Sequence, residues 1–237
     1  MTNSRRDFLR LTTAGLAIGV FPVAARAQAS LKIGTIGSGR IGSTLCEIWL
    51  KAGHEVMFSS LDLEQDKALA AKLGGKARAG TSKEAVAFGD VILLAVPYAA
   101  MPAVGKDVGG LIKGKVVIDV SNPIVSRDGE VATKAREKGA GLASAEYLPG
   151  ARIVRAFNAV GYAQLPEIAQ RKGERPGMPM AGDDKAAIEI ASRLVREVGF
   201  EPVVIGDLAM GRYLVPGTPL SGVQSPEKLR QTAATLK

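Results

Sequence analysis

Histidine and cysteine are almost absent from this chain of 237 residues, which holds one of each, His54 and Cys46. A lone cysteine provides no disulfide framework and no cysteine-based metal site. A lone histidine excludes most Ser-His, Cys-His and multi-His metal chemistries. We expect His54 to be a solvated residue in a turn, and we assign neither metal ligands nor a catalytic side chain.

Aromatic residues are also few, at 5% of the chain, and no block of Lys or Arg is interleaved with them. The formal net charge is +8, but the first 27 residues hold four arginines and one aspartate, so the remainder carries +5. This charge balance does not indicate a nucleic-acid surface, and we expect no nucleic-acid partner. A mild positive field suits an anionic cofactor or substrate.

Long apolar runs are missing except for one near the N-terminus. The run Leu11–Val23 is apolar apart from two threonines, but it is well short of the roughly 20 residues that span a bilayer. It follows a basic segment containing Arg5 and Arg6 and precedes a small-x-small site at Ala25–Ala27. This order is typical of a bacterial twin-arginine (Tat) signal, with an ordinary secretory signal or an uncleaved anchor as alternatives.

We therefore expect residues 1–27 to be a Tat signal peptide and the protein to be periplasmic or otherwise exported. The exact cleavage site stays open, because Ala27–Ala29 offers a second small-x-small match. We expect no membrane span in the mature chain, since no later segment is long and apolar enough.

From Leu31 onward, short β-rich runs alternate with helical patterns. The runs Val91–Val96 and Val116–Ile118 are continuously apolar, as in strands that are buried on both faces of a parallel sheet. The alternation predicts an α/β fold with a doubly wound, mostly parallel sheet in a single domain. We place this domain at residues 28–215 and a C-terminal tail at residues 216–237.

The elements are predicted as follows. The expected strands are 31–36, 55–58, 91–96, 115–120, 152–157, 178–181 and 202–205, and the expected helices are 40–52, 64–73, 82–87, 99–111, 130–138 and 184–198. The connection from Pro123 to Pro149 is the least regular part of the pattern. Asp183, Asp184 and Lys185 indicate capping of a helix N-terminus and are assigned no catalysis.

A glycine pattern follows the first expected strand and opens the first expected helix, with glycines at Gly37, Gly39 and Gly42. In such a G-x-G-x-x-G turn, the first glycine allows the tight turn and the second lets a pyrophosphate approach the backbone. The third allows close packing of helix on strand. The anion then sits at the helix N-terminus. The pattern predicts a Rossmann-type NAD(P)-binding domain.

The choice between NADP and NAD is read at the end of the second strand, where the sequence has Ser59-Ser60-Leu61-Asp62. No carboxylate stands at Ser59 or Ser60, where NAD-binding proteins usually place one for the ribose 2′-hydroxyl. Two small hydroxyls leave room for a 2′-phosphate, with Arg40 or Ser38 as further contacts. NADP is therefore favoured, and NAD stays open because no basic residue follows the serines.

Two further turns stand at the ends of the expected strands 91–96 and 115–120, at Val96-Pro97-Tyr98 and Asn122-Pro123. Cofactors of such folds bind outside the carboxyl ends of the strands, and Asn122 offers an amide for a carboxamide or hydroxyl. Tyr98 and Phe157 are candidates for shaping a ring pocket, with a plain core role as the alternative for either. The full set of candidate cofactor-binding residues is Gly37, Ser38, Gly39, Arg40, Ile41, Gly42, Ser59, Ser60, Val96, Pro97, Tyr98, Asn122, Pro123, Ala156 and Asn158.

These motifs together resemble the NADP-dependent coenzyme F420 (deazaflavin) oxidoreductase family, and also the N-terminal domain of six-transmembrane ferric reductases. The resemblance covers nearly the whole chain after the expected signal. It rests on residues 37–42, 52–56, 59–60, 95–97, 119–123, 155–158, 181–184, 199–202 and 206–209. Two positions depart from the family pattern: Leu61 stands where an arginine is common, and Val215 replaces an acid.

The resemblance implies hydride transfer between NADP(H) and a flavin or deazaflavin-like acceptor, a small-molecule partner. Such transfer needs close orientation of two rings rather than an acid or base of the protein. A deazaflavin, FMN, a ferric chelate and a quinone stay open as the acceptor, and a homodimer stays open as the oligomeric state.

Two other functions compete with this one. Dehydrogenases of the 6-phosphogluconate or pyrroline-5-carboxylate reductase type carry a large helical second domain. We expect that class not to apply, because the about 30 residues after Gly206 are too few for such a domain. The other is an exported dinucleotide-binding module without turnover, acting as a redox sensor or as a subunit of an electron-transfer assembly.

Overall fold

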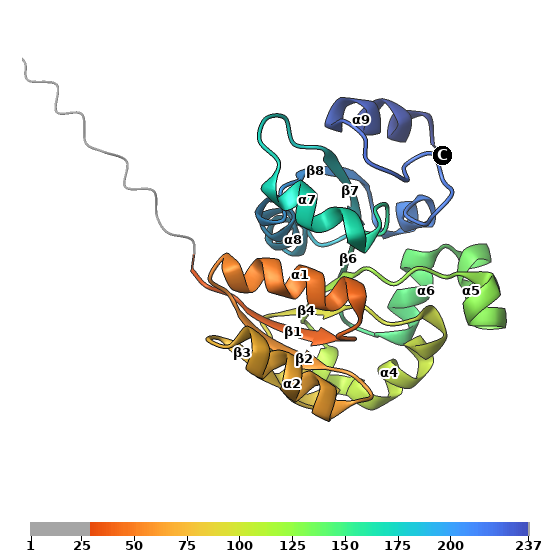
Figure 1. Cartoon of the computed structure of the whole chain (residues 1–237). Coiled ribbons are helices and arrows are strands. Elements are labelled where there is room, and N and C mark those ends of the chain that lie inside the picture. Colours follow the sequence, from red (N-terminus) through yellow and green to blue (C-terminus); the bar gives the residue numbers. More distant parts are fainter. Residues whose placement is uncertain (1–28, 237) are drawn as a thin grey trace, which may run out of the picture.

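A computed structural model describes residues 29–236 of the chain (Figure 1). The expected signal peptide lies outside the described residues, so its assignment stays a prediction. Within the described part, no helix combines the length and apolar composition that crossing a membrane requires.

One sheet of eight strands forms the centre of the molecule, in the order β3-β2-β1-β4-β5-β6-β7-β8. Every neighbouring pair is parallel except β6 and β7, which run antiparallel. This arrangement confirms the predicted α/β fold with a mostly parallel sheet. The strands are β1 (Lys32–Ile36), β2 (Glu55–Ser59), β3 (Ala77–Ala79), β4 (Val91–Leu94), β5 (Val116–Asp119), β6 (Arg152–Arg155), β7 (Gly177–Gly182) and β8 (Glu201–Gly206).

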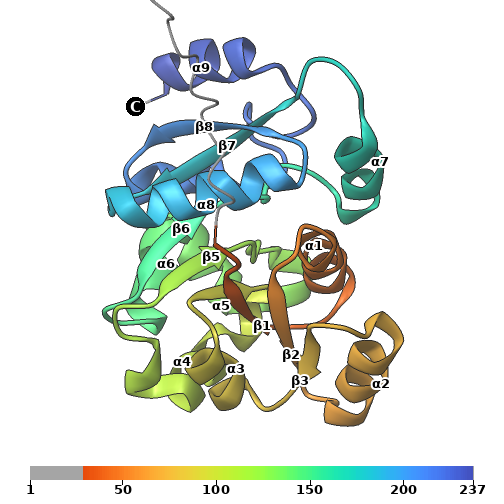
Figure 2. The same ribbon diagram turned by 90° about the vertical axis from the view of Figure 1, so that its left-hand side faces the viewer.

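Helices cover both faces of the sheet (Figures 1 and 2). The longer helices are α1 (Arg40–Lys51), α2 (Leu63–Leu73), α3 (Ser82–Phe88), α4 (Met101–Val108), α5 (Val125–Lys138), α6 (Ala140–Tyr147), α7 (Leu165–Gln170), α8 (Lys185–Glu197) and α9 (Pro226–Thr235). The part of the chain that the structure describes also has four 3-10 helices, η1 (Tyr98–Ala100), η2 (Gly109–Ile112), η3 (Tyr162–Gln164) and η4 (Leu208–Tyr213).

The continuously apolar strands divide their side chains between two cores. In β4, Val91 and Leu93 belong to the core under α1 and α8, whereas Ile92 and Leu94 belong to the core under α4 and α6. Both sets are fully buried. Successive residues of a strand point to opposite faces, so an unbroken apolar run is what a strand covered on both sides requires.

Trp49 joins helices α1 and α8 on the first of these faces. Its indole N–H donates to the carbonyl of Leu194 at 3.0 Å, and its ring meets Phe157 edge-on. Asp184 begins α8, accepting a hydrogen bond from the backbone N–H of Ala187 at 2.8 Å, which confirms the predicted cap.

Several elements differ from the sequence predictions. Strand β3 was not predicted, because its three residues include no β-branched side chain. In the connection from Pro123 to Pro149, expected to be the least regular part with one helix at 130–138, α5 includes that range but starts earlier, with a break at Gly129 where φ is +58°. Helix α6, in the same connection, was not predicted. Helices α7 and α9 were also not predicted.

The segment expected as a C-terminal tail packs against the outer end of the sheet. Helix α9 lies beside β7 and β8 (Figure 2). Its Leu229 is fully buried with Val203 and Leu220. An isolated bridge between Gly177 and Gln224 ties the same segment to the backbone of β7. The last residues described therefore share the core of the domain.

Candidate functional site

The glycine turn between β1 and α1 is closed by backbone contacts that leave no room for side chains. Gly37 has φ of +101°, and its N–H donates to the carbonyl of Ser59 at 2.8 Å. A Cβ at Gly37 would lie 2.3 Å from the carbonyl oxygen of Ala95, and one at Gly42 would lie 2.0 Å from that of Gly37. The first and third glycines are thus required by packing, as the motif predicts.

The middle glycine is different, because a Cβ at Gly39 would meet nothing within 4 Å. Gly39 is the N-cap of α1, no side chain caps that end, and the first turn holds no acidic residue. The free N–H groups and the positive end of the helix dipole are therefore available to an anion. The open space at Gly39 is where a bound pyrophosphate would approach the backbone.

A cleft of about 630 Å³ extends from this turn along the carboxyl ends of β1, β2 and β4 to helix α4. Its lining comprises Ile36, Gly37, Ser38, Gly39, Ser60, Leu61, Asp62, Gln65, Ser82, Ala95, Val96, Pro97, Ala100, Ala103, Val104 and Asp107. Four polar lining residues stand outside the predicted binding set: Asp62, Gln65, Ser82 and Asp107. The apolar residues of α4 were not predicted, since a helix that merely faces the cleft leaves no motif in the sequence.

The predicted cofactor-binding residues form two groups in the structure, and five belong to neither: Arg40, Ile41, Gly42, Ser59 and Tyr98. Gly37, Ser38, Gly39, Ser60, Val96 and Pro97 lie together in the cleft lining. Of the others in the glycine motif, Ile41 packs against the core under α1, and Gly42 is buried inside the helix. The assignment of all these residues to a cofactor stays a prediction.

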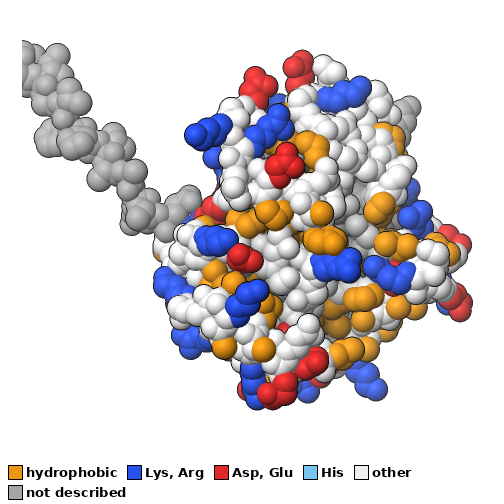
Figure 3. Space-filling model, in the orientation of Figure 1, with side chains coloured by type: hydrophobic (Ala, Val, Ile, Leu, Met, Phe, Trp, Pro, Cys, Tyr) orange, Lys and Arg blue, Asp and Glu red, His pale blue; other side chains and the backbone are white. Residues whose placement is uncertain are grey.

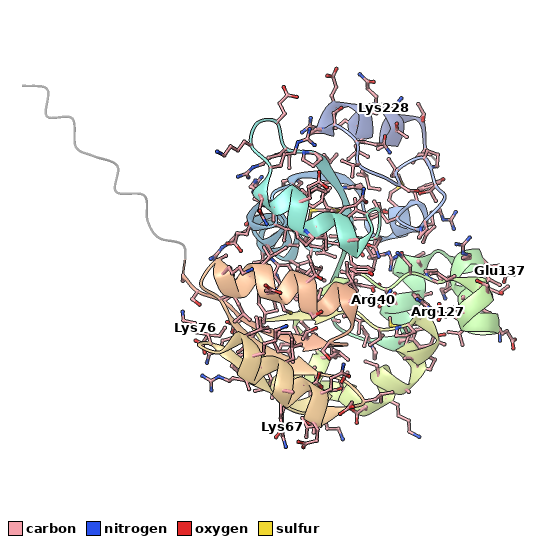
Figure 4. The ribbon with its side chains drawn as sticks, in the orientation of Figure 1. Arg40, Lys67, Lys76, Arg127, Glu137 and Lys228 are labelled. Carbon is pink, nitrogen blue, oxygen red and sulfur yellow. The ribbon has the colours of Figure 1, made fainter. Side chains whose placement is uncertain are left out.

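Ser59 and Arg40, both considered as contacts to a 2′-phosphate, are engaged elsewhere. Ser59 is fully buried and its hydroxyl donates to the carbonyl of Thr35 at 2.6 Å. The guanidinium of Arg40 lies over the ring of Tyr162, 5.5 Å from its centroid. Figure 4 shows Arg40 at the N-terminal end of α1, on the side that faces Arg127 of α5 rather than α2.

Ser60 and Ser38 share one partner that sequence reasoning missed, the carboxylate of Asp66 in the first turns of α2. The Ser60 hydroxyl donates to Oδ2 of Asp66 at 2.8 Å, and the Ser38 hydroxyl donates to Oδ1. Asp66 is fully buried. A signal existed in the sequence, because a helix that starts directly after β2 places its first turns at the same edge of the sheet as the glycine turn.

Asn122, Pro123, Ala156 and Asn158 form the second group, at the ends of β5 and β6. The side-chain amide of Asn122 donates to the backbone carbonyl of Asn158 at 3.1 Å, and its oxygen accepts from the Asn158 amide at 3.3 Å. None of the four lies in the lining of the cleft. Within the described chain, Oδ1 of Asn158 is buried without a hydrogen-bond partner, so this rim retains one free acceptor.

Tyr98 and Phe157, considered as walls of a ring pocket, both lie in the core. Tyr98 is fully buried, and its hydroxyl donates to the carbonyl of Ala140 at 3.0 Å and contacts Ser144. Burial, and next the charge of Asp119, raise the pKa of Tyr98 well above its usual range. Phe157 packs between Trp49 and Phe200 with φ of +63°.

The expectation that His54 is a solvated turn residue is wrong, because only 1% of it is exposed. Its Nδ1 accepts from the backbone N–H of Leu31 at 2.9 Å, and its Nε2 lies 2.7 Å from Oε2 of Glu197. The histidine therefore ties the start of β1 to the end of α8. It directly precedes β2, whereas the cleft lies beyond the other end of that strand, at Ser60. Cys46 is also buried, and burial raises the pKa of its thiol.

The face of the molecule that Figure 3 shows is of mixed character. Figure 3 shows blue and red side chains interspersed over this face, with hydrophobic side chains gathered over α4, α5 and α6. The cleft itself is mainly apolar, with the polar groups concentrated at the turns after β1 and β2. Such a combination suits a ligand with an anionic centre and flat apolar ends.

Comparison with known proteins gives consistent matches. A family model described as NADP oxidoreductase, coenzyme F420-dependent, matches residues 32–123. The F420-dependent NADP reductase of Methanothermobacter marburgensis is 30% identical over 204 residues, which cover 80% of this chain and 90% of that protein. The rat metalloreductase STEAP3 is 28% identical over 188 residues, covering 76% of this chain but only 35% of that protein.

Among solved structures, a hypothetical protein from Sinorhizobium meliloti matches with a TM-score of 0.70 and 26% identity. The match covers 81% of this chain and 93% of the other. The similarity therefore extends beyond the glycine turn to the strands and helices of both halves of the sheet.

Proposed function

Because this chain belongs to the family of coenzyme F420-dependent NADP oxidoreductases, we propose that it transfers a hydride between NADP(H) and a flavin or deazaflavin-like acceptor. The observation that carries the proposal is the cleft that joins the glycine turn of Gly37–Gly42 to the ends of β2 and β4. Its relatives are named for NADP and F420, and the residues at the turn suit a dinucleotide.

The fit is clearest at the pyrophosphate position. A Cβ at Gly39 would enter open space at the uncapped end of α1, so the backbone there accommodates an approaching anion. Val96 and Pro97 supply an apolar wall at the end of β4, which keeps water away from a flat ring. When bound, the nicotinamide supplies or accepts the hydride.

The chain's own contribution is binding and orientation. Hydride transfer between two stacked rings gains most of its rate from holding them at close range, and it requires no proton transfer by a side chain. This agrees with the lining of the cleft, in which the described residues include no His, Cys, Tyr or Lys.

Stopped-flow oxidation of NADPH and NADH against a deazaflavin, FMN and a ferric chelate tests the proposal. We expect turnover with at least one flavin-type acceptor and its loss in Gly39→Asp. This substitution has room in the folded chain but puts a negative charge at the pyrophosphate position. Gly110→Asp is the matched control, because a Cβ at Gly110 also meets nothing within 4 Å and Gly110 lies outside the cleft lining.

Tight dinucleotide binding without oxidation in any of these assays would contradict the enzymatic proposal. It would favour the exported module without turnover. Turnover that survives Gly39→Asp would show that the dinucleotide binds elsewhere.

We also propose that the protein is exported by the Tat pathway with its dinucleotide already bound. The support is the order of the two motifs in the sequence, Arg5-Arg6 before the glycine turn, because Tat substrates cross the membrane folded and free NADP(H) is scarce outside the cytoplasm. Protein isolated from the periplasm should yield bound nucleotide on extraction, and Arg5→Lys with Arg6→Lys should retain it in the cytoplasm. An empty periplasmic protein would refute the loaded export.

A further inference from the structure

The hydroxyl protons of Ser38 and Ser60 are both committed to Asp66. A serine hydroxyl has one proton and two lone pairs. The Ser60 hydroxyl has two acceptors within reach, Oδ2 of Asp66 at 2.8 Å and the backbone carbonyl of Asp62 at 3.2 Å. The shorter contact, to the charged carboxylate, takes the proton. Ser60 also accepts from the backbone N–H of Asp62 at 3.1 Å. Ser38 donates to the other carboxylate oxygen. Toward the cleft, these hydroxyls therefore present lone pairs rather than protons.

Lone pairs at this position favour the ribose of NAD(H) over the phosphorylated ribose of NADP(H). The 2′-hydroxyl of NAD(H) is a donor and can give its proton to such a serine. The 2′-phosphate of NADP(H) has only acceptor oxygens near neutral pH, so it would face other acceptors and the buried charge of Asp66. The space left by the two small serine side chains is thus not enough to favour binding of the 2′-phosphate.

Lys and Arg side chains that could offset the negative charge of Asp66 are not directed toward Ser38 and Ser60. Among the described residues that line the cleft, none is Lys or Arg, whereas Asp62 and Asp107 contribute carboxylates. Leu61, next to Ser60, is fully exposed and uncharged. Lys83 beside the lining has its Nζ 3.5 Å from Asp107, and Lys67 is paired with Glu64 at 2.8 Å. Figure 4 shows Lys67 pointing outward from α2.

We propose that Asp66 determines the dinucleotide selectivity of this cleft, so that the protein takes NAD(H) at least as well as NADP(H). The inference rests on the proposed dinucleotide site and refines its cofactor. Asp66 acts by holding the protons of Ser38 and Ser60 and by placing a negative charge beneath the ribose. It is a specificity-determining residue and has no part in hydride transfer.

Dissociation constants of NAD+ and NADP+, measured by calorimetry on the full chain and on Asp66→Asn, test this. Asparagine keeps the shape but donates one hydrogen bond itself, so one serine proton is released toward the cleft. The ratio of NADP+ to NAD+ affinity should rise on the order of tenfold. Leu61→Arg, an exposed substitution, should raise the same ratio by placing a guanidinium at the rim.

Asp62→Asn is the matched control, because it removes a cleft carboxylate that holds neither serine proton and an asparagine still caps α2. The inference requires a smaller rise in the ratio for Asp62→Asn than for Asp66→Asn. An equal rise would overturn the inference, since the affinity ratio would then respond to the removal of any negative charge in the cleft.

The unsubstituted protein decides the question even if Asp66→Asn does not fold. Binding of NAD+ equal to or tighter than NADP+ supports the inference, and binding of NADP+ more than about threefold tighter overturns it while leaving the proposed function intact. If neither dinucleotide binds, the proposed function fails together with the inference. Binding data separate these outcomes without any assay of turnover.

Discussion

Nη1 of Arg155 donates a hydrogen bond to Oδ2 of Asp119 at 2.6 Å, and both side chains are fully buried between β5 and β6. The same carboxylate oxygen accepts from Ser144 at 2.8 Å, and Arg155 also donates to the carbonyl of Leu214 at 3.0 Å. The ion pair thus connects the parallel half of the sheet to the segment that follows η4. Buried pairs of this kind are costly to break, because the remaining charge has no partner.

Replacing Arg155 by Met should therefore lower the free energy of unfolding by about 3–5 kcal/mol, since Asp119 is left charged and buried. The double variant Arg155→Met with Asp119→Leu should recover much of that loss. Urea denaturation of the two variants measures the difference. Equal stability of the single variant and the unsubstituted protein would show that the pair contributes little.

Removing the hydroxyl of Tyr98 should affect stability but not dinucleotide binding. In Tyr98→Phe, the carbonyl of Ala140 and the hydroxyl of Ser144 each lose one hydrogen-bond partner in the core. The free energy of unfolding should fall by about 1–2 kcal/mol. The dissociation constant for NADP+ should stay unchanged, because Tyr98 lies outside the cleft lining. A weakened affinity without loss of stability would restore Tyr98 to the ring pocket that the sequence suggested.

The third glycine of the turn should tolerate no methyl group. Gly42→Ala places a Cβ 2.0 Å from the carbonyl oxygen of Gly37, so the turn must shift, at a cost of about 1–3 kcal/mol. Thermal melting should show the loss, and dinucleotide affinity should fall with it. Gly39→Ala is the control, because its Cβ meets nothing within 4 Å; it should melt like the unsubstituted protein.

The ion pair between Arg152 and Asp184 should make stability depend on pH under acid conditions. The hydrogen bond from Arg152, followed by that from the N–H of Ala187, lowers the pKa of Asp184 from about 3.8 to about 2. The folded state therefore binds this proton less readily than the unfolded chain does. The contribution of this ion pair to the free energy of unfolding is fully present above about pH 4 and is lost as the pH falls toward 2.

Urea denaturation from about pH 5 to about pH 2 tests this pH dependence, because that range includes the pKa of Asp184 in both the unfolded and the folded chain. The unsubstituted protein should lose more stability across it than Arg152→Met does. Parallel losses in the two proteins would assign the acid sensitivity to other carboxylates, such as Glu197. The pKa of Glu197 is raised by burial but lowered overall by its contacts with His54 and Arg193.

Contacts between distant segments account for what could not be predicted from the sequence. His54 is a turn residue by its neighbours in the chain, yet it is buried, because Glu197 approaches it from 143 residues further along. Ser38 lies in the glycine turn before α1, and Asp66 lies in α2, 28 residues further along the chain. The sequence places Asp66 near the end of β2 but does not show that its carboxylate accepts from both serine hydroxyls, so the small size of the serines alone favours a phosphate there.

Features of this protein that depend on local chemistry follow from its sequence alone. Continuous apolar runs predicted strands covered on both faces, and the spacing of Gly37, Gly39 and Gly42 predicted a tight turn open to an anion, because these features follow from period and from the absence of a Cβ. Whether a serine hydroxyl presents its proton or its lone pairs to the cleft depends instead on long-range packing. That choice depends on Asp66, which α2 brings beneath the two serines.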